Sequence, residues 1–480
     1  MNIERLIAYL NQEKGCTLSS SYYQNVQAWE AWWRGFYKPF HEFKELNGKT
    51  RKTRQLYSLR MAKKVCEDWA SILLNEKTRI VVDDPASSRF LQGSEEEPGG
   101  VFAENDFWIK GNALIEKAFY SGTGAILLRV KQMQVQQGNI VPDAQTKLCL
   151  DFLPAGGILP LTVREGKIVE AAFASEVLVR GEVQIYLQIH EQENDGYRIT
   201  NAYLLETNGQ LQKRPLPEGM VEQIHTGSGL PWFVIVGPNI VNNIEGANGL
   251  GISVYANAID NLKGVDLAYN NFNRDFHLGG KKVFYTQEMI QYGEDGKEIT
   301  PDDVCQQLFV RVGDEVLSGG EKALVQEFNP QLRVQDNRDG LQAQLDYLSF
   351  KCGLGTKHYQ FNAGQVVTAT QYMGDKQELI QNASKHYIVV EKALQDLVRL
   401  LLWAGKTLCG AEVNPQTGVK VQFDDSYIID KESERLRDQQ EVRDGLMQRW
   451  EYRVKWYGES EEEAKAAIQG ESALSFGGEQ

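Results

Sequence analysis

The sequence has few of the residues that carry enzyme chemistry. Its 480 residues include six cysteines and six histidines. The cysteines are scattered without a Cys-x-x-Cys pair, and the histidines lack the His-Glu-x-x-His spacing of a zinc site. This pattern predicts reduced core cysteines, and we expect no bound metal, no cofactor and no classical catalytic site.

Long hydrophobic runs and excess positive charge are also missing. The apolar run Leu397–Ala404 is interrupted by Arg399, and it is far shorter than the roughly 20 residues that cross a membrane. Asp and Glu together number 65 against 51 for Lys and Arg, which gives a net charge of −14. We therefore expect no membrane partner, and such an acidic chain is a poor candidate for gripping nucleic acid through counterion release.

What the sequence does have is an apolar content of 42%, enough for a packed core. Residues 1–82 are predicted to be helical, although a basic segment lies within them at 44–64. That segment carries only Glu45 against the cations Lys44, Lys49, Arg51, Lys52, Arg54, Arg60, Lys63 and Lys64. We interpret it as a solvated helix face or a partner for ion pairs between subunits, with phosphate contact as the alternative.

The region from 107 to 250 has a different pattern. Phe107–Tyr120 is a predicted helix that ends at the glycines of 122–124. Short runs rich in β-branched residues predict strands at Ala125–Val130, Ile168–Phe173, Val183–His190, Tyr197–Leu205 and Phe233–Ile235. This region is therefore predicted to be a strand-rich domain of modest size.

A long amphipathic helix is predicted from Ile252 to Phe276, after the glycine-rich stretch 246–251. Its apolar residues recur at intervals of three and four, the pattern of helices that pack along their length. The opposite face is small or polar and consists of Asn257, Asn261, Gly264, Ala268, Asn271 and Asp275. Such a face indicates close helix neighbours or a water-filled lumen, because an exposed monomer helix usually carries Lys and Glu.

A compact insertion is predicted to follow this helix, over about 281–330. Runs at Val283–Thr286 and Leu308–Val312 predict two strands there. A second helix is predicted over 337–352, and a glycine-containing loop over 353–367.

The third predicted helix has the strongest periodicity in the chain. It begins at the capping box Thr368–Gln371 and continues to about Gly405, with Gly374 as the expected bend. A strand at Val419–Phe423 and a charged helical segment at Asp430–Ile468 complete the prediction.

Two kinds of motif could be mistaken for ligand sites. Gly405-Lys406-Thr407 looks like the end of a phosphate-binding loop, but Leu400 occupies the position of the first required glycine and the triplet follows a helix. We therefore expect no nucleotide site there. The carboxylate pairs Asp302-Asp303 and Asp424-Asp425 would more often face solvent than bind a cation, and the sequence leaves this question open.

Six short stretches carry a family likeness through their order and spacing. They are Met61–Ala70, Gly249–Ser253, Asn329–Arg333, Thr368–Gln371, Phe423–Asp430 and Tyr457–Ala464. From about residue 20 to 470 the chain resembles the portal proteins of tailed bacteriophages, in particular the type found in phages and prophages of Gram-positive bacteria. Gln371 is a departure, because glutamate is more frequent there, although a capping box accepts either.

The resemblance implies a portal-like α+β architecture with long stem helices, a strand-rich wing, a small α/β clip insertion and a helical crown. The implied regions are a wing (1–250), stem helix one (251–278), clip (279–336), stem helix two (337–352), tunnel loop (353–367), a long bent helix that returns to the wing (368–429), and a crown (430–480). We also expect a ring, typically of twelve subunits.

The resemblance further implies a channel at the capsid vertex through which double-stranded DNA is packaged and ejected. The protein itself would be no enzyme. Its implied partners are other copies of the chain, double-stranded DNA without sequence specificity, the terminase large subunit, the head–tail connector or adaptor, and the major capsid and scaffold proteins. The implied location is the virion, after assembly in the host cytoplasm.

Candidate site residues are placed on this implied architecture. The candidates for lining the DNA channel are Lys351, Lys357, His358, Asn257, Asn261 and Asn271. The candidate hinges of the tunnel loop are Gly353, Gly355 and Gly364, and the candidate helix kink is Gly374. The candidates for docking at the clip are Lys281, Lys282, Glu294 and Asp295. Sparse positive or neutral groups in an acidic ring would guide a duplex without trapping it.

Two other functions stay open at this point. One is a capsid-assembly or head-completion protein that forms no channel, and a ring with a central hole would argue against it. The other is a nucleotide-using enzyme that employs Gly405-Lys406-Thr407, and binding of a nucleotide by the purified chain would identify it.

Overall fold

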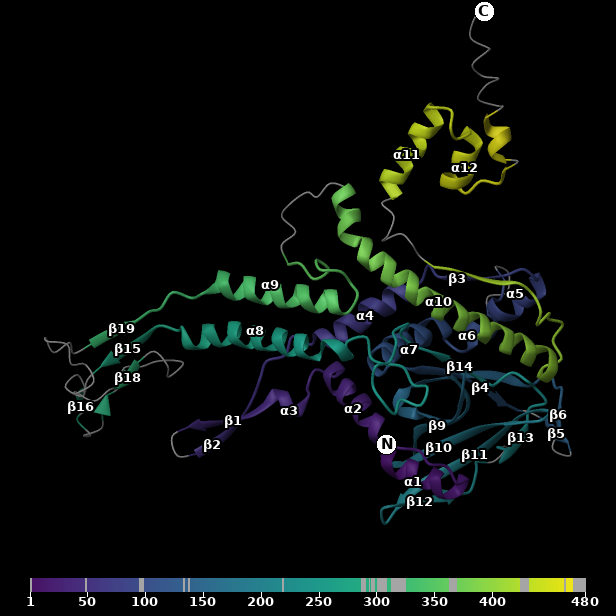
Figure 1. Cartoon of the computed structure of the whole chain (residues 1–480), viewed down its shortest axis with the longest axis horizontal. Coiled ribbons are helices and arrows are strands. Elements are labelled where there is room, and N and C mark those ends of the chain that lie inside the picture. The colour runs from purple at the N-terminus through teal and green to yellow at the C-terminus, as the bar shows by residue number, and fades with distance from the viewer. Residues whose placement is uncertain are drawn as a thin grey trace, which may run out of the picture.

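The computed structural model gives the protein a broad body from which two long helices project to one side (Figure 1). A smaller unit with helices α11 (Lys431–Arg443) and α12 (Arg449–Tyr457) follows the body toward the C-terminus. The structure describes residues 2–47, 50–94, 99–132, 134–136, 139–217, 220–285, 291–292, 294, 298–299, 309–311, 325–361, 369–423, 431–461 and 463–468.

The N-terminal segment is helical at first and then departs from the prediction. Helices α1 (Ile3–Lys14), α2 (Ser21–Trp33) and α3 (Lys38–His41) are followed by an antiparallel hairpin of β1 (Glu42–Asn47) and β2 (Thr50–Gln55). The helical prediction was therefore wrong for the two strands of this basic segment, whereas its last residues, from Met61 on, begin the predicted helix Met61–Leu73. The β-branched threonines of the segment, Thr50 and Thr53, favour a strand.

Helices α4 (Met61–Leu73) and α7 (Phe107–Ser121) form the centre of the body. Both were predicted from their apolar spacing, and both are confirmed. Trp69 and Phe119 are fully buried between them, with ring centroids 5.9 Å apart. The shorter elements β3 (Arg79–Val82), α5 (Pro85–Gln92) and α6 (Gly100–Glu104) connect the two helices.

Two antiparallel sheets make the strand-rich part of the body. The larger has the order β12-β11-β10-β9-β8 with β13 beside β11, and the smaller has the order β14-β4-β7. The five strands predicted here are confirmed as β4, β9, β10, β11 and β14. The bounds in the two sheets are β4 Gly124–Lys131, β7 Lys147–Pro154, β8 Ile158–Arg164, β9 Lys167–Val179, β10 Glu182–Glu193, β11 Gly196–Thr207, β12 Gln210–Arg214, β13 Gln223–His225 and β14 Phe233–Val236. A separate small hairpin joins β5 (Gln134–Gln136) to β6 (Asn139–Val141).

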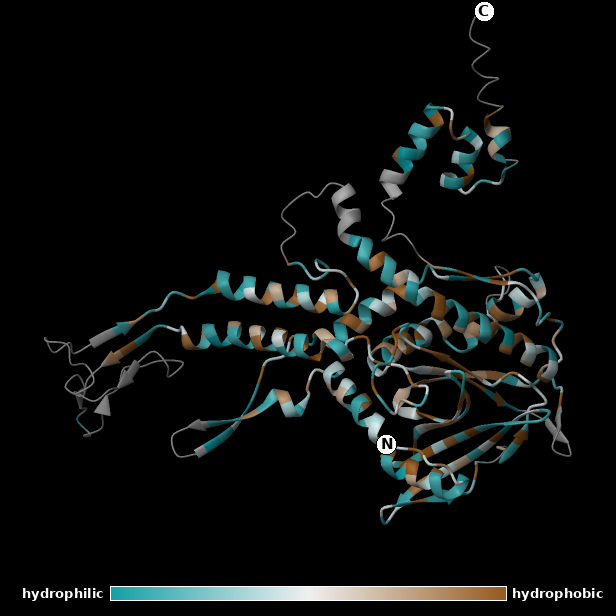
Figure 2. Cartoon of the chain, viewed as in Figure 1, coloured by the Kyte–Doolittle hydropathy of each residue, from teal (hydrophilic) through white to brown (hydrophobic). Residues whose placement is uncertain are grey.

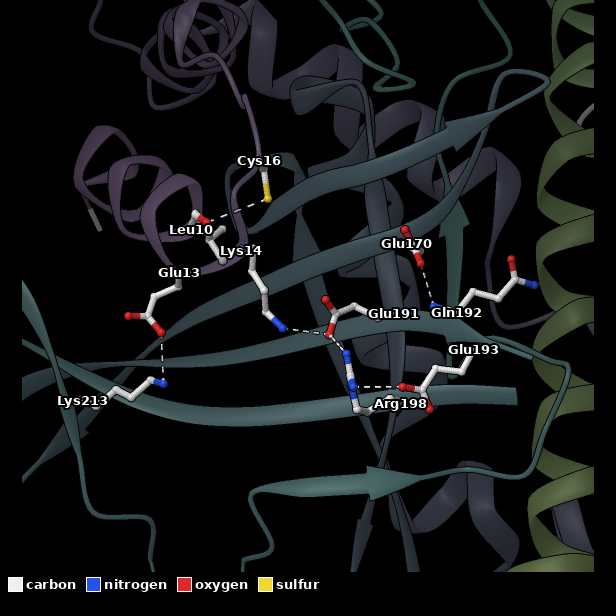
Figure 3. A network of polar contacts seen from close by, with 10 residues as sticks. All are labelled: Leu10, Glu13, Lys14, Cys16, Glu170, Glu191, Gln192, Glu193, Arg198 and Lys213. Carbon is white, nitrogen blue, oxygen red and sulfur yellow. Dashed lines mark hydrogen bonds and ion pairs between the residues drawn. The ribbon is translucent and has the colours of Figure 1, made fainter. Parts of the chain in front are cut away.

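Helix α1 packs beside the large sheet through its buried apolar side and through ion pairs between charged side chains (Figure 3). Lys14 Nζ lies 2.8 Å from Glu191 Oε2, which also accepts a hydrogen bond from Arg198, and Lys213 pairs with Glu13 at 3.2 Å. Burial raises the pKa of the Glu191 carboxyl, but the hydrogen bonds from Lys14 and Arg198 outweigh it and the pKa is lowered.

The two projecting helices are α8 (Ile259–Leu278) and α9 (Val334–Lys351), which pack against each other. The predicted start of the first helix at Ile252 was wrong, because contacts with the body hold residues 251–255 outside helical geometry and a 3₁₀ turn, Ala256–Ala258, follows. Helix α8 has 20 residues, which makes it ~30 Å long. The second helix is confirmed and begins slightly earlier than predicted.

The insertion between α8 and α9 consists of strands in its described part. Strand β15 (Lys282–Tyr285) pairs in parallel with β18 (Phe309–Arg311) and antiparallel with β19 (Val325–Phe328), which confirms the two predicted strands. Strands β16 (Gln291–Tyr292) and β17 (Glu298–Ile299) form a second pair. The helical part of the expected α/β insertion does not occur among the described residues.

The third predicted helix is confirmed as α10 (Ala369–Leu408), which has 40 residues and runs across the body (Figure 1). The first residue of its predicted capping box, Thr368, lies outside the described residues. After α10, β20 (Val419–Gln422) pairs with β3 and returns the chain to the body, as the strand prediction required.

One histidine is buried in the large sheet without a polar partner. His190 on β10 is fully buried, and neither ring nitrogen has a hydrogen-bond partner among the described residues. The rings of Phe173 and Phe233 meet it edge-on, with centroid distances of 5.2 and 5.5 Å. Burial in these surroundings lowers the pKa of His190 to about 3, so the folded chain holds a neutral imidazole.

Substitution His190→Leu should reduce the acid sensitivity of the fold. Below the ordinary pKa of 6.5 the unfolded chain takes up a proton here that the folded chain refuses until about pH 3. The free energy of unfolding therefore decreases as the pH decreases. This residue alone accounts for about 2 kcal/mol of the decrease at pH 5. Denaturant unfolding near pH 8 and near pH 5 measures the difference, with His277→Leu as the exposed control. An identical pH dependence in H190L and the parent chain would contradict this account.

Candidate functional site: the projecting helix pair

The base of α8 is joined to the body where glycines let two backbone segments cross. Gly122, after α7, and Gly251, before α8, lie so close that a Cβ atom on either would overlap the other's carbonyl group. Gly251 N donates to Thr123 Oγ1 at 2.7 Å, and Tyr22 OH donates to Gly251 O. The glycine-rich stretch 246–251 therefore ends in a tight junction that holds the entry to α8 in place.

The middle of α8 is anchored by one buried carboxylate. Asp266 is 3% exposed and accepts hydrogen bonds from Leu59 N at 2.7 Å, Ser58 Oγ at 3.0 Å and His41 Nε2 at 2.9 Å. Tyr37 N donates to His41 Nδ1, so the hydrogen-bond network assigns the ring proton to Nε2. Because His41 directly precedes β1 and Ser58 follows β2, Asp266 ties both ends of the β1–β2 hairpin to α8.

Small and polar residues of α8 take part in its contact with α9. A Cβ atom on Gly264 would overlap the side chain of Gln344. Asp275 accepts hydrogen bonds from Arg333 at 2.7 Å and Asn337 at 3.0 Å, and the bond from Arg333 lowers the pKa of the Asp275 carboxyl. For Gly264 and Asp275, the close neighbour predicted from the small, polar face is thus a helix of the same chain.

The three asparagines predicted to line a channel are spread along this element. Asn257 lies in the 3₁₀ turn before α8, is exposed and accepts a hydrogen bond from Asn243 at 3.1 Å. Asn261 is half-buried in the first turn of α8, and Asn271 is exposed farther along the helix. They are spread over the 3₁₀ turn and helix α8 rather than clustered.

The projecting helices expose large apolar side chains. Phe276 and Leu278 of α8 are 49% and 57% exposed, and Tyr347 and Phe350 of α9 are 62% and 50% exposed. Figure 2 shows hydrophobic segments, in brown, among the hydrophilic ones on both helices. The predicted apolar stripe of α8 is thus buried at its base, at Leu262 for example, and uncovered toward its far end. Phe276 and Leu278 lie at the far end of the pair, whereas Tyr347 and Phe350 lie at its body end, because the start of α9 contacts Asp275 near the end of α8. Exposed apolar side chains of this size are candidates for contact with another molecule.

The cationic candidates lie at the end of α9 and in the turns after it. Lys351 is the last residue of α9, and both it and Lys357 are exposed. His358 is directed to the body instead, because its Nε2 lies 3.3 Å from Asp68 on α4, which also accepts a 2.8 Å hydrogen bond from Tyr359 OH. Burial raises the pKa of the Asp68 carboxyl, but the hydrogen bonds it accepts, His358 foremost, leave it lowered.

The glycine candidates occupy different surroundings. Gly353 and Gly355 have φ angles of 78° and 84°, a left-handed conformation that suits glycine at the end of α9. Gly353 O also accepts a hydrogen bond from Asn382 on α10 at 3.1 Å, so this turn is held by its neighbours. Gly364 lies outside the described residues, and α10 runs through Gly374 as one helix.

The docking candidates belong to the insertion. Lys281 pairs with Glu327 at 2.8 Å, and Lys282 begins β15. Glu294 is exposed between β16 and β17, while Asp295 lies outside the described residues.

Of the two kinds of motif, only Gly405-Lys406-Thr407 lies in the described part of the chain. The residues Asp302, Asp303, Asp424 and Asp425 lie outside it. Within it, no group of three or more His, Cys, Asp or Glu side chains is arranged to hold a metal ion. No helix in that part is both long and apolar enough to span a membrane. Gly405-Lys406-Thr407 lies inside α10, where a Cβ on Gly405 would come within 2.6 Å of Phe90.

Sequence reasoning missed the residues that hold α8 to the body. Asp266 directly follows Val265 of the apolar stripe, and both are buried. A charged residue beside an apolar stripe is usually solvated. The role of Asp266 is therefore evident only from the structure, in which His41 contacts it. The glycine cluster 246–251 was a sequence signal for the junction at Gly251. The spacing of its glycines does not indicate which other segment of the chain approaches there.

Substitution Asp266→Ala should destabilise the chain by about 3 kcal/mol, because it leaves buried donors of His41, Ser58 and Leu59 without an acceptor. Asp260→Ala is the matched control on the same helix, since Asp260 is 93% exposed and its loss should cost less than about 1 kcal/mol. Denaturant unfolding measures both values. Equal stability losses for the two variants would show that Asp266 does not anchor α8.

Comparison with known proteins identifies the family that shares this arrangement. The model of the family described as "Phage portal protein, SPP1 Gp6-like" matches residues 14–466, which is nearly the whole chain. No curated protein sequence matches the chain significantly. The match covers the body, the projecting helices and the C-terminal helical unit together. The chain therefore belongs to the SPP1 Gp6-like phage portal proteins, a family of structural rather than enzymatic capsid proteins.

Proposed function

We propose that copies of this chain form a ring, a dodecamer by the family resemblance, that surrounds an open channel at the capsid vertex. Double-stranded DNA would pass through this channel during packaging and ejection, without sequence specificity. The chain would contribute no catalysis, and the motor ATPase would be a separate protein. Membership of the portal family supports the general role, and the projecting helix pair supports the channel.

The observation that carries the proposal is the uncovered apolar surface of α8 and α9. Phe276, Leu278, Tyr347 and Phe350 are each about half exposed or more in the single chain. Burying such a side chain against a neighbour contributes about 2 kcal/mol, and a ring repeats that gain at every interface. Helix pairs standing side by side around an axis would cover these residues and leave a bore inside them.

The charge of the chain suits a conduit. With −14 per copy, a ring of many copies repels phosphate on average, so DNA would not adhere to the wall. Lys351 and Lys357 would supply sparse positive groups at the level where α9 ends, and Asn257, Asn261 and Asn271 would supply neutral polar ones. His358 would contribute only if its contact with Asp68 opens.

The remaining assignments follow the same architecture. The insertion 279–336 would be the clip that docks the terminase large subunit and later the head–tail connector, with Lys281, Lys282, Glu294 and Asp295 as contact candidates. The body would be the wing and α11–α12 part of the crown, in contact with capsid and scaffold proteins. The residues 353–367 would act as the tunnel loop, moving at Gly353, Gly355 and Gly364, and Gly374 would allow α10 to bend. Assembly would take place in the host cytoplasm.

Substitution of Leu278 and Phe350 by aspartate should prevent ring formation while preserving the monomer, because both side chains are already exposed in the single chain. Each charge placed in a subunit contact should cost about 2 kcal/mol or more per interface. Native mass spectrometry of the purified variant should show monomers where the parent shows rings. Val241→Asp, at a body residue that is 89% exposed, is the control. Rings of normal size in the double variant would rule out this interface.

Substitution of Lys351 and Lys357 by alanine should slow DNA packaging several-fold without altering the ring, because the duplex would lose its positive guides. A packaging reaction with purified motor measures the rate. The exposed wing residue Lys167 provides the control as Lys167→Ala. Unchanged packaging in the double variant would argue against a guiding role for this pair.

A further inference from the structure

A cavity lies where the two sheets of the body meet. Its volume is about 330 Å³, which is at the small end of the roughly 300–1,000 Å³ typical of ligand pockets. Its lining comes from strand β4 of the small sheet and from strands β10, β11 and β13 of the large sheet. Of the described residues that line the cavity, none belongs to α8 or α9. The cavity is therefore separate from the projecting helix pair.

The inner part of this cavity is apolar. Leu128 and Ile199 are fully buried, and Trp232, which directly precedes β14, is 1% exposed. Ile224 on β13 is also buried, and Met220 is half-buried. Such a lining favours a ligand with an apolar body, and the flat indole of Trp232 suits an aromatic ring.

Most polar side chains of the wall already have partners. The guanidinium of Arg129 lies 2.6 Å from Asp151 Oδ2 and stands over the ring of Tyr186, 4.4 Å from its centroid. Tyr186 OH donates to Asn201 Oδ1 at 2.8 Å, and Asn201 Nδ2 donates to Val221 O at 2.8 Å. These contacts hold the wall in one shape, so the cavity is preformed in the single chain.

Gln188 on β10 differs from these neighbours. It lines the same cavity and is only 7% exposed. Its side-chain amide has no hydrogen-bond partner among the described residues and keeps some accessible surface. A buried amide without a partner costs free energy. A polar ligand atom at Gln188 would remove that cost, because the amide can both donate and accept a hydrogen bond.

The mouth of the cavity is positively charged. Lys131 lines it and is exposed, and Lys147 stands opposite Lys131 in the register of β4 and β7. Asp151 balances the charge of Arg129, whereas Lys131 forms no ion pair with another described residue. The described lining residues include no Asp or Glu. A cation without compensation at the mouth favours a ligand with one negative charge.

We propose that this cavity binds a small aromatic carboxylate whose ring carries a hydroxyl group. The ring would lie against Trp232, the hydroxyl would pair with the amide of Gln188, and the carboxylate would lie at the mouth beside Lys131. All three contacts belong to one chain, so binding does not depend on the proposed ring of subunits.

Binding of para-hydroxyphenylpropionate to the full-length protein tests this inference. A ligand-observed NMR titration should give a dissociation constant of about 1 mM or below. Phenylpropionate, which lacks the hydroxyl, should bind roughly fivefold more weakly, because it leaves the Gln188 amide unpaired. The uncharged para-hydroxyphenylpropanamide should bind roughly threefold more weakly, because it loses the attraction to Lys131.

Two substitutions assign these contacts separately. Gln188→Leu should abolish the preference for the hydroxylated probe and keep the preference for the carboxylate, whereas Lys131→Gln should do the reverse. Gln184→Leu on the same strand and Lys167→Gln on β9 are the matched controls, and both should keep the two preferences. Denaturant unfolding checks that each variant is folded, and Gln188→Met replaces Gln188→Leu if that variant does not fold.

The outcomes decide the inference in either direction. A parent chain that binds none of the three probes would overturn it, and so would folded Gln188 and Lys131 variants that retain both preferences. Met220→Trp should fill the cavity and abolish binding of every probe. Unchanged binding in that variant would place the probes elsewhere and would also overturn the inference.

Discussion

The fixed departure of α8 from the body is the constraint on which the rest of the molecule depends. A helix that projects into solvent can lean in any direction unless its base is held by directed contacts. Here the backbone crossing of Gly122 and Gly251 fixes the entry, and the buried Asp266 fixes the first half of the helix. Neither contact tolerates a small displacement. The glycine crossing has no room for a Cβ atom, and a shift of Asp266 would leave buried hydrogen-bond donors without an acceptor.

This attachment gives meaning to the apolar residues farther out. If α8 were free to fold back, Phe276 and Leu278 near its far end would find cover on the body of their own chain. Held away from it, they remain exposed, and only another molecule can cover them. The same contacts that stabilise the monomer thus leave it incomplete, which is the property expected of a subunit built for a closed assembly. In the proposed ring, the net charge of −14 per chain would keep the assembly from adhering to DNA.

Much of the fold was predictable from periodicity, and the site was predictable only in outline. Helices α4, α7, α9 and α10 and the central strands follow from regular apolar spacing, because burial on one side produces that spacing directly. The β1–β2 hairpin was missed because most of its residues are polar, so that no apolar periodicity marks its strands. The start of α8 was misplaced because tertiary contacts at Gly251 override local helical preference. The role of Asp266 depends on His41, a residue more than two hundred positions away, and no local pattern reveals such a meeting.

Electron microscopy of the purified full-length protein, together with its native mass, tests the central claim most directly. The account predicts closed rings with a central hole, in which α8 and α9 of adjacent copies stand side by side. A protein that stays a compact monomer at every concentration would contradict it, if a water-soluble footprinting reagent also reaches the side chains of Leu278 and Phe350.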